Sequence, residues 1–352
     1  MDETAPFSLN DLESTSESKK TYAERLGWPK ESKVVIFHVD DAGMSHESNE
    51  GAMEAIDFGL ANSTSIMMPC SWSPEFLSYL RKKPKIDAGI HLTLTSEWDT
   101  YRWRPILGKN AVPGLCDEHG FLWHTVADVL SHATVDEVDR EIQAQFEQAI
   151  FMGFNPTHID THMFTLFANE KFLEVYIKLG IEKKIPIMFP GGDNVFYLSE
   201  RNANSLIDMQ NGINSLVDPI IPNSESLIYF KKIGRLLWEN GLPVLDDLHN
   251  SSYGWKMPDI RSKTDIEIQA WYTDKYIQSL DKLSAGLTMV ILHCTKHSDT
   301  FDFISDSGYK RKGELLAMID PRLKAYMMKN NIILTTWREV TERRNKLMSD
   351  QY

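Results

Sequence analysis

The chain has 352 residues, 42% hydrophobic and 11% aromatic, and its 50 acidic residues outnumber 37 basic ones to give a net charge of −13. This composition supplies a large core and excludes a disordered chain, while the acidic balance argues against a protein that binds nucleic-acid backbones. No apolar run reaches the roughly 18–20 residues of a membrane-spanning helix. We therefore expect a soluble protein with no nucleic-acid partner and no membrane span.

The first 20 residues are rich in Ser, Glu and Asp and lack the charged start and apolar segment of a secretory signal. We interpret residues 1–20 as a mobile acidic tail. They could begin a cytoplasmic protein or an exported one whose signal is absent from this chain. The widely spaced Cys70, Cys116 and Cys294 predict reduced, buried thiols rather than a zinc motif or a disulfide scaffold.

Strands and helices alternate through the first half of the chain. In chain order, hydrophobic patterning predicts a short helix at 21–27, strand 34–37, helix 45–60, strand 63–68, helix 74–82, strand 88–94, helix 135–151 and a strand end at 156–162. Ser45 is the expected N-cap of its helix and Gly59 lies near the end. Residues 96–124 are rich in Trp and Pro with little periodicity, which predicts a long loop at one end of the domain.

The same alternation continues after residue 170. In chain order we expect helix 172–179, strand 185–189, a weak strand at 243–245, helix 266–283, strand 287–293, helix 320–329 and a last strand at 332–336. Residues 191–260 are expected to contain a long insertion. About seven strands without a Gly-rich dinucleotide turn favour an α/β fold, a (β/α) barrel in a single domain over 21–345, rather than an open doubly wound sheet.

Acidic residues and histidines gather where four of these strands end. They are Asp40, Asp41, His91, His158, Asp160, His162 and His293. Because the carboxyl ends of parallel strands share one rim, we expect these side chains to converge into a site. The alternatives for single positions are an acidic helix cap at Asp40-Asp41 and hydrogen-bonded core histidines at His91 and His293.

The spacing of His158, Asp160 and His162 favours a metal site. In a strand all three would face one side, and in a helix the two histidines would share a face. Two histidines with a carboxylate suit a first-row dication that keeps open positions, as catalytic sites do. His293, with His297 as an alternative, is a suitable general acid because an imidazole titrates near working pH.

Four segments of the chain match a known family in order and spacing: V-V-I-F-H-V-D-D-A-G-M, G-I-H-L-T-L-T, P-T-H-I-D-T-H and V-I-L-H-C. Over about residues 21–342 the chain resembles the YdjC-like carbohydrate deacetylases, also called the ChbG family. The resemblance implies a distorted (β/α) barrel related to polysaccharide deacetylases. It also implies one divalent metal ion, Mg or Zn, and removal of an acetyl group from an N-acetylated oligosaccharide of the chitooligosaccharide kind.

Carried over by position, the resemblance implies that Asp41, His91 and His162 bind the metal. It makes Asp40 the general base for a metal-activated water and His293 the acid that protonates the leaving amine.

By the same comparison, His158 and Asp160 orient the metal ligands through hydrogen bonds. Two other functions stay open at this point, a metal-dependent hydrolase of another amide or ester and a non-catalytic carbohydrate-binding barrel. Assembly as a homodimer is also left open.

Overall fold

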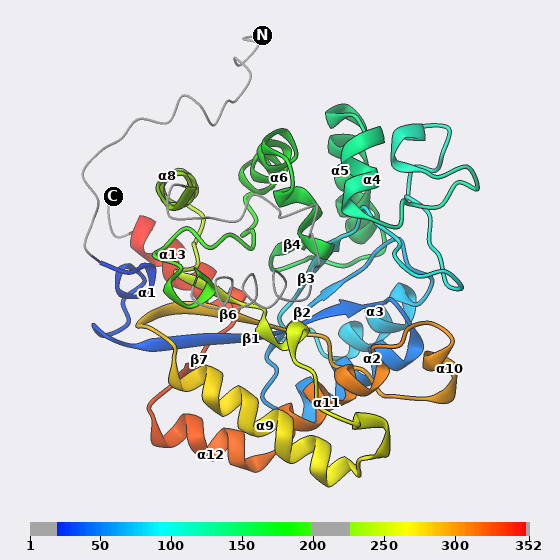
Figure 1. Ribbon diagram of the computed structural model, residues 1–352. Coiled ribbons are helices and arrows are strands. Elements are labelled where there is room, and N and C mark those ends of the chain that lie inside the picture. The colour runs from blue at the N-terminus through cyan, green and yellow to red at the C-terminus, as the bar shows by residue number, and fades with distance from the viewer. Residues whose placement is uncertain (1–19, 199–225, 350–352) are drawn as a thin grey trace.

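The computed structural model of the protein describes residues 20–198 and 226–349 (Figure 1). All but the last residue of the expected tail, and residues 199–225 of the expected insertion, lie outside this part. The described strands form one parallel sheet, namely β1 (Lys33–Ala42), β2 (Ser63–Ile66), β3 (Ala88–Leu92), β4 (Ile159–Thr161), β5 (Asp247–His249), β6 (Gly286–Leu292) and β7 (Ile333–Leu334). The strand order is β4-β3-β2-β1-β6-β5, and β7 pairs with β1.

Strand β1 is the centre of the sheet. Its apolar, β-branched run is buried on both faces, as expected for a strand covered on each side by helices. One edge pairs with β6 from Lys33 to Val39, and the other edge pairs first with β7 and then with β2. This central position places the carboxyl end of β1 at the middle of the rim.

Single bridges connect the outer strands of the curled sheet. Ile187 pairs with Ile159 of β4, and Pro190 pairs with Leu245 just before β5. The prediction of a regular strand at 185–189 is therefore wrong. Prolines at 186 and 190 lack the N–H that a ladder needs, which reduces this segment to isolated contacts. The fold is thus a distorted parallel barrel, as the sequence predicted.

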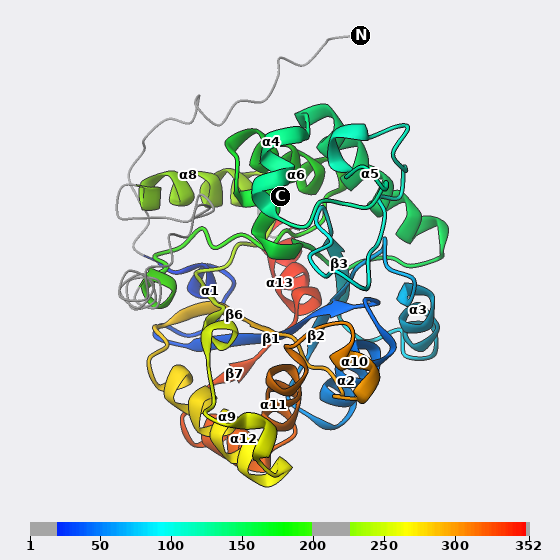
Figure 2. The same ribbon diagram turned by 45° about the vertical axis from the view of Figure 1, so that its right-hand side comes forward.

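Helices surround the sheet. In chain order they are α1 (Tyr22–Arg25), α2 (His46–Phe58), α3 (Ser73–Lys82), α4 (Val126–His132), α5 (Val135–Phe151), α6 (Glu170–Lys183), α8 (Ser226–Glu239), α9 (Asp265–Asp281), α10 (Asp299–Asp302), α11 (Gly308–Met318), α12 (Pro321–Lys329) and α13 (Trp337–Ser349). In Figure 1, α5 and α6 lie above the sheet, and α9 and α12 lie below it. Figure 2 shows α11 beside α2 and α10, at the end of the barrel that carries the polar cluster described below.

Helix boundaries with strong caps were predicted well. Ser45 caps α2 by accepting from the backbone N–H of Ser48, and Gly59 follows its last residue. Helix α5 begins with a reciprocal capping box between Thr134 and Glu137. The sequence did not predict α4, α8, α10, α11 or α13.

All three cysteines are free and buried, which confirms the expectation of reduced thiols. Among the described residues, every helix is too short or too polar to cross a bilayer. The boundaries of the single domain at residues 21 and 345 stay predictions.

Candidate active site

Strands β1, β3 and β4 bring their polar residues together at their carboxyl ends. His91 of β3 pairs directly with Asp160 of β4, and His162 begins the 3-10 helix η3 (His162–Phe167) that follows β4. With Asp40 and Asp41 of β1 these side chains form one buried cluster. The convergence that the sequence predicted for these five residues is therefore present.

Both acids of β1 lie within the strand and not after it, which corrects the predicted end at residue 37. The pairing with β2 shifts register between Val39 and Ala42, and Asp41 has a φ of +65°. A non-glycine residue in this left-handed region costs of order 1–3 kcal/mol and is often found at functional sites. The irregularity lets both carboxylates approach one atom: His91 Nε2 lies 3.9 Å from Asp40 Oδ2 and 3.4 Å from Asp41 Oδ1.

Asp41, His91 and His162 present three potential ligand atoms to one another. Asp41 Oδ1 lies 3.4 Å from His91 Nε2 and 3.4 Å from His162 Nδ1, and the two nitrogens are 3.2 Å apart. Within the described part of the chain, this buried oxygen has no hydrogen-bond partner. An oxygen without a partner facing two imidazole nitrogens fits a first-row dication.

The atoms that face away from this point are all held by hydrogen bonds. His91 Nδ1 donates to Asp160 Oδ1 at 2.6 Å, and His162 Nε2 donates to Glu97 Oε2 at 3.0 Å. Asp41 Oδ2 accepts from Arg311 Nη1 at 2.6 Å. Metal-binding histidines characteristically give their second N–H to a carboxylate, which fixes the tautomer and the ring orientation.

The electrostatics of the cluster favour positive charge at its centre. Burial alone would raise the pKa of Asp41, but Arg311 and the two histidines hold that pKa well below its usual value. Burial would lower the pKa of His91, yet Asp40 and Asp160 raise it well above the ordinary value. A dication would neutralise the same negative potential.

Three groups of described residues could each hold a metal ion. Their members are Asp41, His91 and His162; Asp40, His91 and Asp160; and His38, His158 and Asp160. The first group is the one that the family resemblance implies, whereas the set His158, Asp160 and His162, which the sequence spacing favoured, is not among the three groups. The first group is also the one in which both histidines are oriented by separate carboxylates, Asp160 and Glu97.

His38 lies beneath the cluster on β1. Its ring contacts the hydroxyls of Ser63 and Ser65, and its Nε2 lies 2.8 Å from Asp160 Oδ2 and 3.1 Å from Asp40 Oδ1. Burial lowers the pKa of His38, but the two carboxylates outweigh it and raise the pKa to about 9. Both carboxylates therefore face the same nitrogen of the His38 ring.

His158 has different surroundings from the histidines at the rim. Its Nδ1 is 2.9 Å from Thr157 Oγ1, and its ring stacks on Trp337 at 5.3 Å. Its Nε2 is 3.9 Å from Asp160 Oδ2. Burial, with the neighbouring charge of His38, lowers the pKa of His158 well below its ordinary value, so this histidine is neutral.

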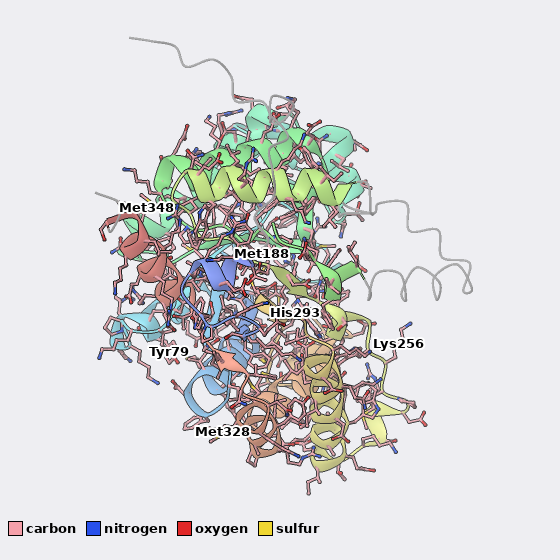
Figure 3. The ribbon with its side chains drawn as sticks, turned by 90° about the vertical axis from the view of Figure 1, so that its left-hand side faces the viewer. Tyr79, Met188, Lys256, His293, Met328 and Met348 are labelled. Carbon is pink, nitrogen blue, oxygen red and sulfur yellow. The ribbon has the colours of Figure 1, made fainter. Side chains whose placement is uncertain are left out.

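His293 follows β6 and lies near the middle of the molecule, whereas Lys256 lies at its edge (Figure 3). Its backbone N–H donates to Glu314, its Nδ1 is 3.6 Å from Glu314 Oε2, and its side chain is 13% exposed. Helix α11 supplies both Glu314 and the Arg311 that binds Asp41. One helix thus connects His293 to the cluster. The alternative acid His297 instead contacts Asp302 at 3.0 Å.

Sequence reasoning assigned no role to His38, Glu97, Arg311 or Glu314. His38 could have been found, because it lies two residues before Asp40 and therefore on the same side of a strand. Arg311 and Glu314 are three residues apart and share a helix face, but nothing in the sequence indicated a helix there. Glu97 lies in a loop without periodicity and gave no signal.

Comparison with known proteins identifies the family of this fold and cluster. The family model described as "YdjC-like protein" matches residues 34–329. The chain belongs to the YdjC-like family. A carbohydrate deacetylase of Enterococcus faecalis is 31% identical over 219 residues, which cover 61% of this chain and 75% of that protein.

Two other relatives match shorter stretches of this YdjC-like chain. A carbohydrate deacetylase of Thermus thermophilus is 34% identical over 167 residues, 47% of this chain and 57% of the relative. A chitooligosaccharide deacetylase of Serratia marcescens is 31% identical over 135 residues, 37% of this chain and 49% of the relative. The chain thus matches little more than half the length of the Thermus protein.

A solved structure supports the YdjC-like fold. It is a protein of Enterococcus faecalis described as a candidate cellobiose-phosphate cleavage protein, and it superposes with a TM-score of 0.64 at 19% identity. The superposition covers 88% of this chain and 99% of the other. At this identity the likeness establishes the architecture alone.

Proposed function

We propose that this YdjC-like protein is a metal-dependent hydrolase that removes the acetyl group from an N-acetylated sugar of the chitooligosaccharide kind. The names of its relatives, carbohydrate deacetylase and chitooligosaccharide deacetylase, support the substrate class. The observation that carries the proposal is the partnerless Asp41 Oδ1 between His91 Nε2 and His162 Nδ1, with Asp40 beside them.

Asp41, His91 and His162 would hold the divalent ion. When bound, such an ion acts as a Lewis acid toward a carbonyl oxygen and lowers the pKa of water. Arg311 keeps Asp41 ionised, and Asp160 keeps the Nε2 of His91 free to bind. These three residues therefore match a catalytic metal site, in which three protein ligands leave coordination positions for water and substrate.

Asp40 and His293 supply the proton transfers in this proposal. Water attacks the acetyl carbonyl, and Asp40, whose Oδ1 lies 3.1 Å from His38 Nε2, takes a proton from that water. His293, anchored to Glu314, then gives a proton to the departing sugar amine. The two groups come from different strands, since Asp40 lies on β1 and His293 follows β6, so that one can take a proton while the other gives one.

The substrate class can be tested by measuring acetate release from a panel of acetylated compounds with Mg²⁺ or Zn²⁺ present. We expect acetate and a free amine from N,N′-diacetylchitobiose or its longer homologues, and much less from an O-acetyl ester or a simple acetylated amine. Failure to release acetate from every N-acetylated sugar would overturn the proposal. Release from the ester alone would favour a different hydrolase.

A further inference from the structure

The long loop after β3 delivers a carboxylate to the candidate metal centre. Glu97 lies in this loop, and its Oε2 is 3.0 Å from His162 Nε2. The side chain of Glu97 is 20% exposed and that of His162 only 6%. The contact is therefore largely shielded from water, where a charged hydrogen bond is strongest.

The loop is held by hydrogen bonds immediately before Glu97. Trp103 donates its Nε1–H to the carbonyl of Thr95 at 2.8 Å and its backbone N–H to Ser96 Oγ at 3.0 Å. Arg102 Nε also donates to Ser96 Oγ at 3.2 Å. These bonds hold the chain immediately before Glu97, so that its carboxylate is presented by a rigid segment.

We propose that Glu97 is a positioning residue for the metal centre. By accepting the Nε2–H of His162, it fixes the tautomer whose Nδ1 lone pair faces Asp41 and His91. The proposal rests on the function proposed above and adds a residue to it. Glu97 acts through His162, because it contacts the nitrogen on the far side of the ring from Asp41 Oδ1.

The two histidines of the centre need opposite tautomers. His91 presents Nε2 and gives its Nδ1–H to Asp160, whereas His162 presents Nδ1 and gives its Nε2–H to Glu97. Neutral imidazole can exist in either form, and a hydrogen bond to one nitrogen selects which nitrogen is left to bind a metal. Without Glu97, the described residues offer no other carboxylate contact to His162 Nε2.

The backbone at His162 cannot do this by itself. Met163 and Phe164, the next two residues, both have positive φ, +51° and +52°. This sharp turn determines the position of the His162 Cα atom. The turn is stabilised by Thr95 Oγ1, which donates to Met163 Sδ at 3.4 Å. Rotation of the imidazole about its own bond is not fixed by the turn, and the hydrogen bond to Glu97 fixes it.

The test measures Zn²⁺ affinity of the metal-stripped full chain by competition with a chromophoric chelator. Glu97→Ala should weaken binding by about 10- to 100-fold, the usual effect of removing such a partner. Glu97→Gln should lose less, because its amide oxygen still accepts the Nε2–H. Glu118→Gln, in the same loop with a side chain 86% exposed, is the matched control and should bind as the wild type does.

A spectroscopic signature separates positioning from a general loss of structure. In the Zn²⁺-loaded protein labelled with ¹⁵N-histidine, the Nε2–H of His162 should resonate far downfield and exchange slowly. In the Glu97→Ala variant this signal should move upfield and exchange quickly, while the signal of the His91 Nδ1–H stays in place.

Zn²⁺ binding within twofold of wild type in Glu97→Ala would overturn the proposal, as would His162 coordinating through Nε2. Asp41→Ala is the reference for the centre itself. If that variant also binds Zn²⁺ at wild-type strength, the ligand assignment fails and the role of Glu97 fails with it. The two proposals can also fail separately. If Glu97→Ala binds Zn²⁺ more weakly but the wild type releases no acetate, the positioning role of Glu97 is supported and only the deacetylase activity is contradicted.

Discussion

Asp40 and Asp41 are neighbours in sequence with different surroundings. Arg311 binds one oxygen of Asp41 and leaves the other facing two histidines. Asp40 has no arginine partner among the described residues and instead lies 3.1 Å from His38. The positive φ at Asp41 makes this division possible, because an even strand would send the two side chains to opposite faces.

Replacing Asp40 with Asn should therefore separate catalysis from metal binding. Asp40→Asn keeps the size of the side chain but cannot accept the proton, so turnover should fall by about 10²- to 10⁴-fold. The bound metal, measured by elemental analysis, should stay at the wild-type level. Asp136→Asn on the surface is the control. A variant at position 40 that retains a tenth or more of wild-type turnover would refute the role as base.

The predictable residues of the site are those that strand ends bring together. Asp41, His91 and His162 could be placed in the site because parallel strands share a rim, and the family resemblance implied their role as ligands. Arg311 could not, since it reaches Asp41 from a helix 270 residues away in sequence. Glu97 could not either, because the geometry of an irregular loop depends on tertiary contacts such as those of Trp103.

Among the elements, α2 lies unusually close to the segment that follows β6. A Cβ added at Gly51 of α2 would lie 2.5 Å from Thr295 Cα and 2.6 Å from the carbonyl oxygen of Cys294. Both contacts are with backbone atoms, and moving the backbone costs more free energy than rotating a side chain. The same short segment begins with His293, so the packing of α2 determines where that histidine lies.

Gly51→Ala should force the segment after β6 away from α2. We expect a loss of about 1–3 kcal/mol in the free energy of unfolding, typical of overpacking, together with a lower kcat from a displaced His293. Chemical denaturation and acetate-release kinetics measure the two effects. Glu50→Ala, at a partly exposed position of α2 with a side chain 39% exposed, should change stability by no more than about 0.5 kcal/mol. Wild-type stability and kcat in Gly51→Ala would contradict the close packing.

Elements with a clear local cause could be predicted from sequence, and those that depend on the whole barrel could not. Ser45 and Gly59 delimit α2 as expected, because caps act locally. The weak strand expected at 243–245 lies at Asp247–His249 instead. Pro243 lacks the N–H for a ladder, and the regular pairing with β6 begins only at Asp247.

In the molecule as a whole, the barrel brings the two ends of the described chain together. Helix α13 lies alongside α1, where Arg343 stacks over Trp28 at 4.1 Å and donates to the carbonyl of Leu26 (Figure 1). Asp246 accepts backbone N–H groups from Tyr22 and Leu287, which ties α1 to β6. The first and last helices thus contribute to one cooperative core.

The stability of this core should fall in acid because of His249 on β5. Burial lowers the pKa of His249 to about 3, so the folded chain resists a proton that the unfolded chain accepts below pH 6.5. The contribution of neutral His249 to the free energy of unfolding is fully present above pH 6.5 and is lost as pH falls toward 3. Between pH 7 and pH 5, the free energy of unfolding should fall by about 2 kcal/mol more in wild type than in His249→Phe.

The comparison uses urea denaturation of both proteins at each pH. In the wild type the ring of His249 stacks on that of Phe196 with the ring centroids 4.8 Å apart. A phenyl ring at position 249 should keep this stacking but cannot titrate. Parallel pH profiles of the two proteins would contradict the role of His249. A steeper wild-type profile over this window would confirm the sign and the cause.

The central claim is that a divalent ion held by Asp41, His91 and His162 is required for deacetylation. The most direct test measures bound metal and acetate release together, on N,N′-diacetylchitobiose, for wild type and Asp41→Ala. We predict that wild type binds one dication, loses turnover with a chelator and regains it when the metal is restored, and that Asp41→Ala neither binds metal nor releases acetate. Full turnover by the chelated wild type, or metal and activity retained in Asp41→Ala, would contradict the claim.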